Sequence, residues 1–105
     1  RTRFISTHLS KETYCGDASR LQLGKYDLLL ANIHRNIILM DLRTYSRSLR
    51  AGGVLLLSGF YESDIPDIRT EAVKCGLEFI RQRVENGWAC LHFRRDRSLR
   101  TEEIL

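Results

Sequence analysis

Two unbroken apolar runs constrain the fold of this 105-residue chain more than any other feature. The first covers residues 28–31 (LLLA) and the second covers residues 54–57 (VLLL). A strand covered on one face alternates apolar and polar residues, whereas an unbroken run is typical of a strand buried on both faces, as in parallel sheets. The runs therefore predict two neighbouring parallel strands, the first spanning residues 26–32 and ending at Asn32.

The segment between the two runs has the spacing of a helix. Its larger apolar residues recur at intervals of four, three and four, which places them on one helical face. A stop is expected at residues 50–53 (RAGG), because glycine readily takes the left-handed conformation found at helix ends. Strand, helix and strand joined by short links predict a right-handed βαβ unit. The residues of this stripe are Ile38, Leu42, Tyr45 and Leu49.

A second helix and a hairpin are predicted after the βαβ unit. Asp64 is a plausible N-cap, Pro66 lies in the first turn and Gly76 provides the stop. The strand-like runs 77–84 and 88–93 flank Asn86-Gly87, a dipeptide that strongly favours a tight hairpin turn. The chain should therefore end in an antiparallel pair, which makes the sheet mixed. The stripe of the second helix is Ile65, Ile68, Ala72 and Cys75.

The two ends of the chain carry weaker patterns. Phe4, Ile5 and Leu9 are expected on the last turn of a helix, and residues 12–15 form a short strand that Gly16 ends. The basic residues near the C-terminus, Arg94 and Arg95 among them, are interpreted as a solvated tail without the aromatic residues of a nucleic-acid surface.

Composition fits one small globular domain with 43% hydrophobic and 29% charged residues and a net charge of +4. No apolar run approaches the length of a membrane helix, and no signal peptide is recognisable. The three cysteines form no CxxC pair, which argues against a disulfide framework or a zinc knuckle and favours a cytoplasmic location. Because the first residue is Arg1 and not Met, we expect the chain to begin within a longer gene.

Three stretches, YDLLLANI, LRAGGVLLLSGF and CGLEFIRQRVENGWACLHFRR, resemble the C-terminal half of ribosomal protein methyltransferases of the PrmA type. The resemblance implies a partial Rossmann-like sheet of the class I methyltransferase fold. The expected fold is thus α/β: a parallel βαβ unit, a helix and a C-terminal antiparallel hairpin. On this basis residues 1–95 are the C-terminal part of a catalytic domain, and residues 96–105 are a charged tail.

The same resemblance implies a function. Enzymes of this type use S-adenosylmethionine to methylate amino groups on a protein of the large ribosomal subunit. Their glycine-rich cofactor loop and the acidic residue that binds the ribose would lie upstream of Arg1. We therefore expect the chain by itself to be inactive.

Site residues follow from positions that match the family pattern. Asn32 resembles the Asn that, with the next backbone carbonyl, accepts hydrogen bonds from the target nitrogen and lies at the cofactor. Asp17, followed by Ala18, resembles a contact to the adenine, although a turn aspartate fits the sequence equally well. The end of the first strand and the end of the second are predicted to bind substrate. The residues concerned are Ile33, Ser58, Gly59 and Phe60.

Simpler structural roles compete with these assignments. Asn32 could instead cap the helix that starts near Asn36. His34 has no second histidine or carboxylate at metal-ligand spacing, so a loop role and no metal site are expected. Trp88 matches a family tryptophan and is predicted to pack in the core.

Two other functions stay open. An RNA or glutamine methyltransferase of the same fold usually carries Asn-Pro-Pro-aromatic, whereas this chain carries Asn32-Ile33-His34-Arg35 without a proline. A non-enzymatic interaction module is the second alternative. An unpaired edge on strand 26–32 would then favour self-association.

Overall fold

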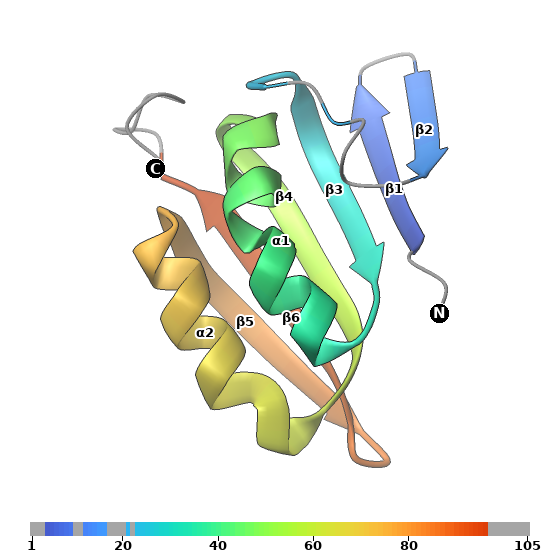
Figure 1. The fold of residues 1–105 in the computed structure, drawn as a ribbon, viewed down its shortest axis with the longest axis vertical. Helices are drawn as coiled ribbons and strands as arrows, with labels where there is room; N and C mark the ends of the chain where they lie inside the picture. Colours follow the sequence, from blue (N-terminus) through green and yellow to red (C-terminus); the bar gives the residue numbers. More distant parts are fainter. Residues whose placement is uncertain (1–3, 10–11, 17–20, 22, 97–105) are drawn as a thin grey trace.

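A computed structural model describes residues 4–9, 12–16, 21 and 23–96 of the chain. The strands in this part form one six-stranded sheet in the order β2-β1-β3-β4-β6-β5 (Figure 1). Among the described residues, two α-helices and a short 3-10 turn, η2, accompany the sheet. The elements are β1 (Phe4–Leu9), β2 (Glu12–Gly16), β3 (Tyr26–Asn32), α1 (Arg35–Ser48), β4 (Leu49–Tyr61), η2 (Glu62–Asp64), α2 (Ile65–Lys74), β5 (Leu77–Glu85) and β6 (Trp88–Arg95).

The predicted βαβ unit is confirmed at the centre of the sheet. β3 and β4 pair in parallel, and Asn32 at the end of β3 is level with Ser58 on β4. The boundary between α1 and β4 differs from the prediction, because Leu49 already begins the strand. At this boundary the buried guanidinium of Arg95 donates to the backbone carbonyl of Leu49. The prediction that Arg95 belongs to a solvated tail is therefore wrong.

The predicted second helix and terminal hairpin are also confirmed. β5 and β6 pair antiparallel, and β6 also pairs antiparallel with β4, so the sheet is mixed. Asn86 and Gly87 connect the two strands with φ angles of 53° and 82°. Both angles lie in the left-handed region, as a type I′ hairpin turn requires at its two central residues.

The N-terminal segment departs from the sequence prediction. β1 is a strand, so the expected last turn of a helix at Phe4, Ile5 and Leu9 is wrong, while the short strand at residues 12–15 is confirmed. β1 pairs antiparallel with β3 from Phe4 opposite Asn32 to His8 opposite Leu28. The predicted unpaired edge on strand 26–32 is therefore wrong, and with it the reason given for self-association.

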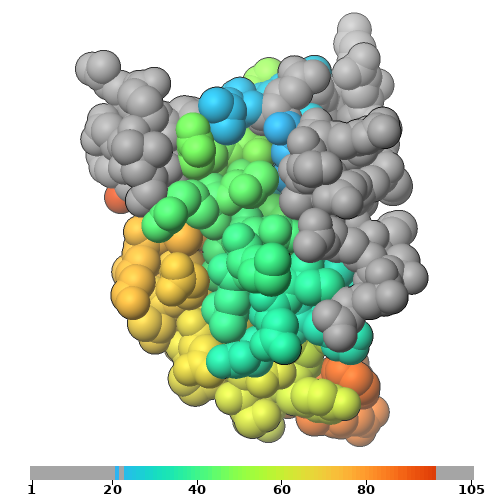
Figure 2. Space-filling view, in the orientation of Figure 1, coloured from blue at the N-terminus to red at the C-terminus, as the bar shows by residue number. Residues whose placement is uncertain are grey.

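Both α-helices of the described part lie on one face of the sheet (Figure 1) and pack side by side (Figure 2). The core between helices and sheet includes Leu29, Leu57 and Phe93, each with none of its surface exposed. On the opposite face the side chains of Leu28 and Val54 are half-buried, and Leu30 is 37% exposed. The apolar runs predict strands that are buried on both faces, but in the described residues helices cover only one face of the sheet. No helix among these residues is long and apolar enough to cross a membrane.

Candidate active site at the carboxyl ends of β3 and β4

A pocket of about 660 Å³ opens where β3 and β4 end, between those strand ends and the β5–β6 hairpin. The carboxyl ends of parallel strands are the usual place for ligands in an open α/β sheet. Two groups of residues line it. From the strand ends and the link to α1 come Asn32, Ile33, His34, Ser58 and Gly59; from the hairpin come Arg83, Glu85, Asn86, Trp88, Ala89 and Cys90.

Asn32 and Gly59 meet at the edge of this pocket. Gly59 is the extra residue of a bulge in β4, because the pairing with β6 shifts between Ser58 and Phe60. Its φ is +94°, and an added Cβ atom would fall closer than 3.0 Å to the Asn32 side-chain oxygen Oδ1. The same Cβ would lie 2.9 Å from the backbone nitrogen and 3.1 Å from the backbone oxygen of Ile33. The missing side chain therefore lets the end of β3 pack directly against β4.

A backbone hydrogen bond fixes this contact. The nitrogen of Ile33 donates to the oxygen of Ser58 over 2.9 Å, so the parallel pairing extends one residue beyond β3. The Ile33 side chain is buried, whereas Asn32 is exposed on the opposite face. Because side chains alternate between the two faces, Ile33 anchors the backbone in the core while Asn32 is presented to solvent.

Four of the predicted site residues gather in this pocket, and a fifth, Phe60, lies beside it. Asn32, Ile33, Ser58 and Gly59 line it together. Phe60 packs in the core with 1% of its surface exposed and lines only a smaller hollow beside the pocket. The predicted adenine contacts, at residues 17 and 18, lie outside the described residues.

The stretch after Asn32 has a structural explanation. α1 begins at Arg35 with His34 as the N-cap residue, so the alternative that Asn32 caps this helix is wrong. Arg35 reaches α2 instead, with its Nη2 atom 2.6 Å from a carboxylate oxygen of Asp67 and its Nε atom 3.8 Å from Asp64. This arginine therefore links the starts of the two helices beside the pocket.

Sequence reasoning missed the aromatic wall of the site. Trp88 is 51% exposed and stacks on Tyr61, so the prediction that it packs in the core is wrong. Alternation along β6 explains the error: Ala89, Leu91 and Phe93 face the helices and are buried, and Trp88 lies on the other face. Reading the alternation of residues 88–93 outward from the Asn-Gly turn would have revealed this.

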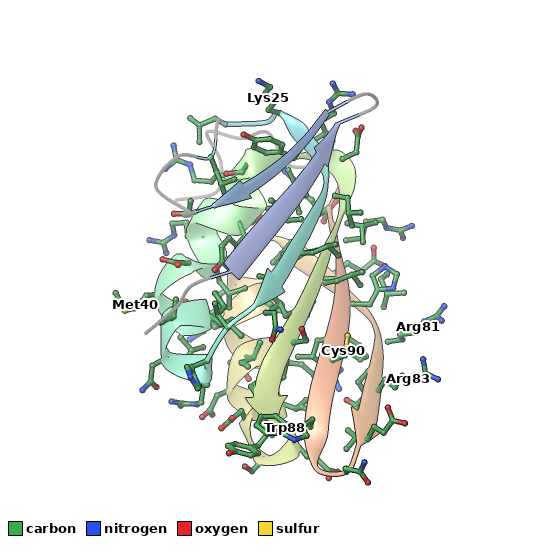
Figure 3. All side chains as sticks on the ribbon, turned by 90° about the vertical axis from the view of Figure 1, so that its right-hand side faces the viewer. Lys25, Met40, Arg81, Arg83, Trp88 and Cys90 are labelled. Carbon is green, nitrogen blue, oxygen red and sulfur yellow. The ribbon has the colours of Figure 1, made fainter. Side chains whose placement is uncertain are left out.

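The hairpin wall carries charge of both signs. Arg83 and Glu85 lie two residues apart on β5 and both line the pocket. Figure 3 shows Arg81 and Arg83 pointing away from the sheet, on the side opposite Met40 of α1. Further along β6, partial burial lowers the pKa of His92, and the neighbouring Arg81 and Arg94 lower it further. Within the described residues, no group of three His, Cys, Asp or Glu side chains is arranged to hold a metal ion.

Comparison with known proteins identifies the family. The model of the family described as ribosomal protein L11 methyltransferase (PrmA) matches residues 6–96. A protein of that name from Bacteroides fragilis is 48% identical over 79 residues, which make up 74% of this chain and 28% of the relative. One from Porphyromonas gingivalis is 48% identical over 82 residues, or 77% of this chain and 28% of the relative. The chain thus spans a little over a quarter of the length of these curated relatives.

A solved structure agrees in fold. The ribosomal protein L11 methylase from Lactobacillus delbrueckii subsp. bulgaricus superposes with a TM-score of 0.68 at 23% identity. The match covers 74% of this chain and 40% of that one, and it supports the methyltransferase fold. Since the family model covers most of its residues, this chain belongs to the ribosomal protein L11 methyltransferase (PrmA) family.

Proposed function

We propose that the chain is the C-terminal part of a catalytic domain that methylates amino groups of ribosomal protein L11 in the cytoplasm, with S-adenosylmethionine as the methyl donor. The names of the relatives support the substrate and the reaction. The observation that carries the proposal is the packing of Asn32 and Ile33 against Gly59. It holds two oxygen acceptors, Asn32 Oδ1 and the Ile33 carbonyl, beside the same glycine at the end of the parallel strands.

Two fixed acceptors suit an amine nucleophile. Methyl transfer is an in-line displacement, so alignment of the nitrogen lone pair supplies much of the rate. Asn32 Oδ1 and the carbonyl of Ile33 would accept hydrogen bonds from the N–H groups and leave the lone pair free. Neither oxygen is a strong base. The amine must therefore lose its proton beforehand, which partial desolvation in the pocket favours.

The donor would meet only part of its site in this chain. S-adenosylmethionine supplies a methyl group on a positively charged sulfur. Asn32 lines the pocket in which such a group would be approached. The family resemblance adds Asp17 and Ala18 as adenine contacts. The glycine-rich loop and the ribose carboxylate would come from other parts of the whole protein.

A chimaera tests the reaction. The matching 79-residue segment of the Bacteroides fragilis relative is replaced by this sequence, and transfer of labelled methyl groups from S-adenosylmethionine to L11 is measured. We expect activity, and a loss of about a hundredfold or more in Asn32→Ala because misalignment of reacting groups costs that much. Asn36→Ala is the control, since Asn36 contacts Arg35 in the first turn of α1. Full activity of Asn32→Ala would contradict the assignment.

Two further measurements complete the test. Ribosomal RNA and a glutamine peptide should not be methylated by the chimaera, and methylation of either would favour the alternative functions. For the 105-residue chain alone we expect no micromolar binding of S-adenosylhomocysteine in calorimetry. Micromolar binding would contradict the prediction that this chain by itself does not hold the cofactor tightly.

A further inference from the structure

The exposed aromatic pair at the end of β4 and the start of β6 is the feature that the proposed function leaves unexplained. Tyr61 and Trp88 stack with ring centroids 4.6 Å apart and ring planes at 22°. More than half of each side chain is exposed, 57% and 51%. A second aromatic pair among the described residues, Phe79 and Phe93, is edge-to-face, and Phe93 is fully buried. Core packing explains the pair of Phe79 and Phe93, but it does not explain why Tyr61 and Trp88 stack at the surface.

The aromatic pair adjoins the candidate active site on both sides. Trp88 lines the large pocket together with Asn32. Tyr61 lines the smaller hollow of about 270 Å³ beside it, and His34 and Gly59 line both spaces. Figure 3 places Trp88 at the end of the sheet, below Cys90 on the same strand. A side chain that reached Asn32 through the large pocket would share that pocket with Trp88, on which Tyr61 stacks.

The chemistry of this wall suits an alkylammonium group. The face of an aromatic ring attracts cations, and an ammonium that carries methyl groups is easier to desolvate and also packs against the ring. Glu85 is the cross-strand partner of Trp88 and lines the pocket, so a carboxylate stands close to the rings. Arg83 lines the same pocket, and its positive charge repels a cation. A methylated ammonium offsets this repulsion better than an unmodified one, because it gains more from contact with the rings.

We propose that Tyr61 and Trp88 form the binding wall for the target lysine side chain, and that they bind its methylated forms more tightly than the unmodified amine. This inference rests on the proposed function and names the part of the substrate that the pocket takes. Methylation keeps the positive charge and adds apolar surface. The wall would therefore hold a partly methylated lysine beside Asn32 for the next transfer.

A purely structural role makes a different prediction. Tyr61 and Trp88 are directly opposite each other on paired strands, and such aromatic pairs stabilise sheets. If that were their whole role, changing them would lower stability and leave peptide binding unchanged. A test must therefore measure binding and stability separately.

Trp88 is the only tryptophan of the chain, so its fluorescence reports on this wall directly. The 105-residue chain is titrated with a short peptide, acetyl-Gly-Lys-Gly-amide, carrying lysine in its unmodified, monomethyl, dimethyl and trimethyl forms. We expect a saturable change in emission and affinity that rises with methylation, by about threefold or more in total. The same peptide with norleucine, which lacks the charge, should not bind.

Three variants separate binding from stability. Tyr61→Phe retains the ring and should keep the affinity for the trimethyllysine peptide. Tyr61→Leu keeps the Trp88 probe but removes one ring, and we expect about two- to fivefold weaker binding. Phe79→Leu removes a ring from the other aromatic pair, so it should lower stability and leave peptide affinity unchanged.

The outcomes distinguish this inference from the proposed function. Equal affinity for all lysine forms, binding of the norleucine peptide, or unchanged binding in Tyr61→Leu would overturn the inference. If the chimaera transfers methyl groups while any of these results holds, the proposed function stands without it. Methylation-dependent binding together with an inactive chimaera would support the binding role of Tyr61 and Trp88 and contradict the proposed reaction.

Discussion

The side-chain oxygen of Asn32 lies so close to the Cα atom of Gly59 that residue 59 has no space for a side chain. A Cβ atom on Gly59 would come closer than 3.0 Å to this oxygen, a separation that real Cβ atoms essentially never show. The glycine therefore has two roles. It permits the left-handed backbone of the β4 bulge, and it leaves space for the Asn32 side-chain oxygen. Bulges often re-aim a side chain next to an active site, and this one acts on the neighbouring strand.

The first prediction separates these two roles. Gly59 and Gly87 both have a positive φ, +94° and +82°, but an added Cβ at Gly87 would meet nothing within 4 Å. Gly87→Ala should therefore lower the free energy of unfolding by about 1 kcal/mol, the cost of the left-handed conformation alone. Gly59→Ala should cost about 1–3 kcal/mol more, because the methyl group overlaps Asn32 and Ile33. Urea unfolding of the two variants measures the difference, and equal losses would contradict this explanation.

The architecture around this contact was predictable because its signals are local. Unbroken apolar runs, a helical stripe and an Asn-Gly turn each depend on a few neighbouring residues, and the βαβ unit and hairpin were confirmed. The position of Asn32 at a strand end followed from the same runs. Its contact with Gly59 did not, because the bulge that places Gly59 appears only once β4 pairs with β6.

The errors share a physical cause: each depends on a partner distant in sequence. The basic stretch near the C-terminus predicts a solvated tail, yet Arg95 is buried and donates to the carbonyl of Leu49. The match to a family tryptophan predicts core packing for Trp88, yet strand alternation places it outside against Tyr61. Phe4, Ile5 and Leu9 predict a helical turn, yet they belong to β1, whose pairing with β3 leaves no periodic signal in six residues.

The second prediction concerns Arg95. Arg95 is 2% exposed, whereas its neighbour Arg94 is partly exposed and pairs with Glu78 over 3.0 Å. Arg95→Met keeps an unbranched apolar side chain but takes the charged donor from the Leu49 carbonyl. We expect a loss of about 1.5–3 kcal/mol in the free energy of unfolding, as for other hydrogen bonds to charged groups. Arg94→Met, the matched control, should change it by less than about 1 kcal/mol. Similar losses in both variants would show that the bond to Leu49 contributes little.

The third prediction is a pH dependence from His92. Partial burial, with Arg81 and Arg94 adding to it, lowers the pKa of His92 below its ordinary value of 6.5. The unfolded chain therefore binds this proton more readily than the folded protein, so protonation favours unfolding. The stability contributed by neutral His92 is complete above pH 6.5 and is lost as the pH falls from there through the lowered pKa.

His92→Gln removes the titrating group and should flatten this part of the profile. Urea unfolding from about pH 5 to about pH 7.5 brackets the ordinary titration range of histidine and isolates the effect as a difference between the two proteins. His34, an exposed histidine in the link before α1, provides the control variant His34→Gln. A profile that keeps its slope in His92→Gln would assign the pH dependence to other groups.

The last prediction concerns the ion pair that joins the two helices beside the site. Arg35 lies 2.6 Å from Asp67, but their side chains are 35% and 60% exposed, so water and salt screen the attraction. Arg35→Gln should therefore cost only about 0.2–1 kcal/mol, and the cost should shrink in molar salt. Arg50→Gln, which breaks the similarly exposed pair with Asp27, is the matched control. If Arg35 also holds the start of α1 in place, its variant alone should weaken the binding of the trimethyllysine peptide. Equal peptide affinity in the two variants would limit Arg35 to a small role in stability.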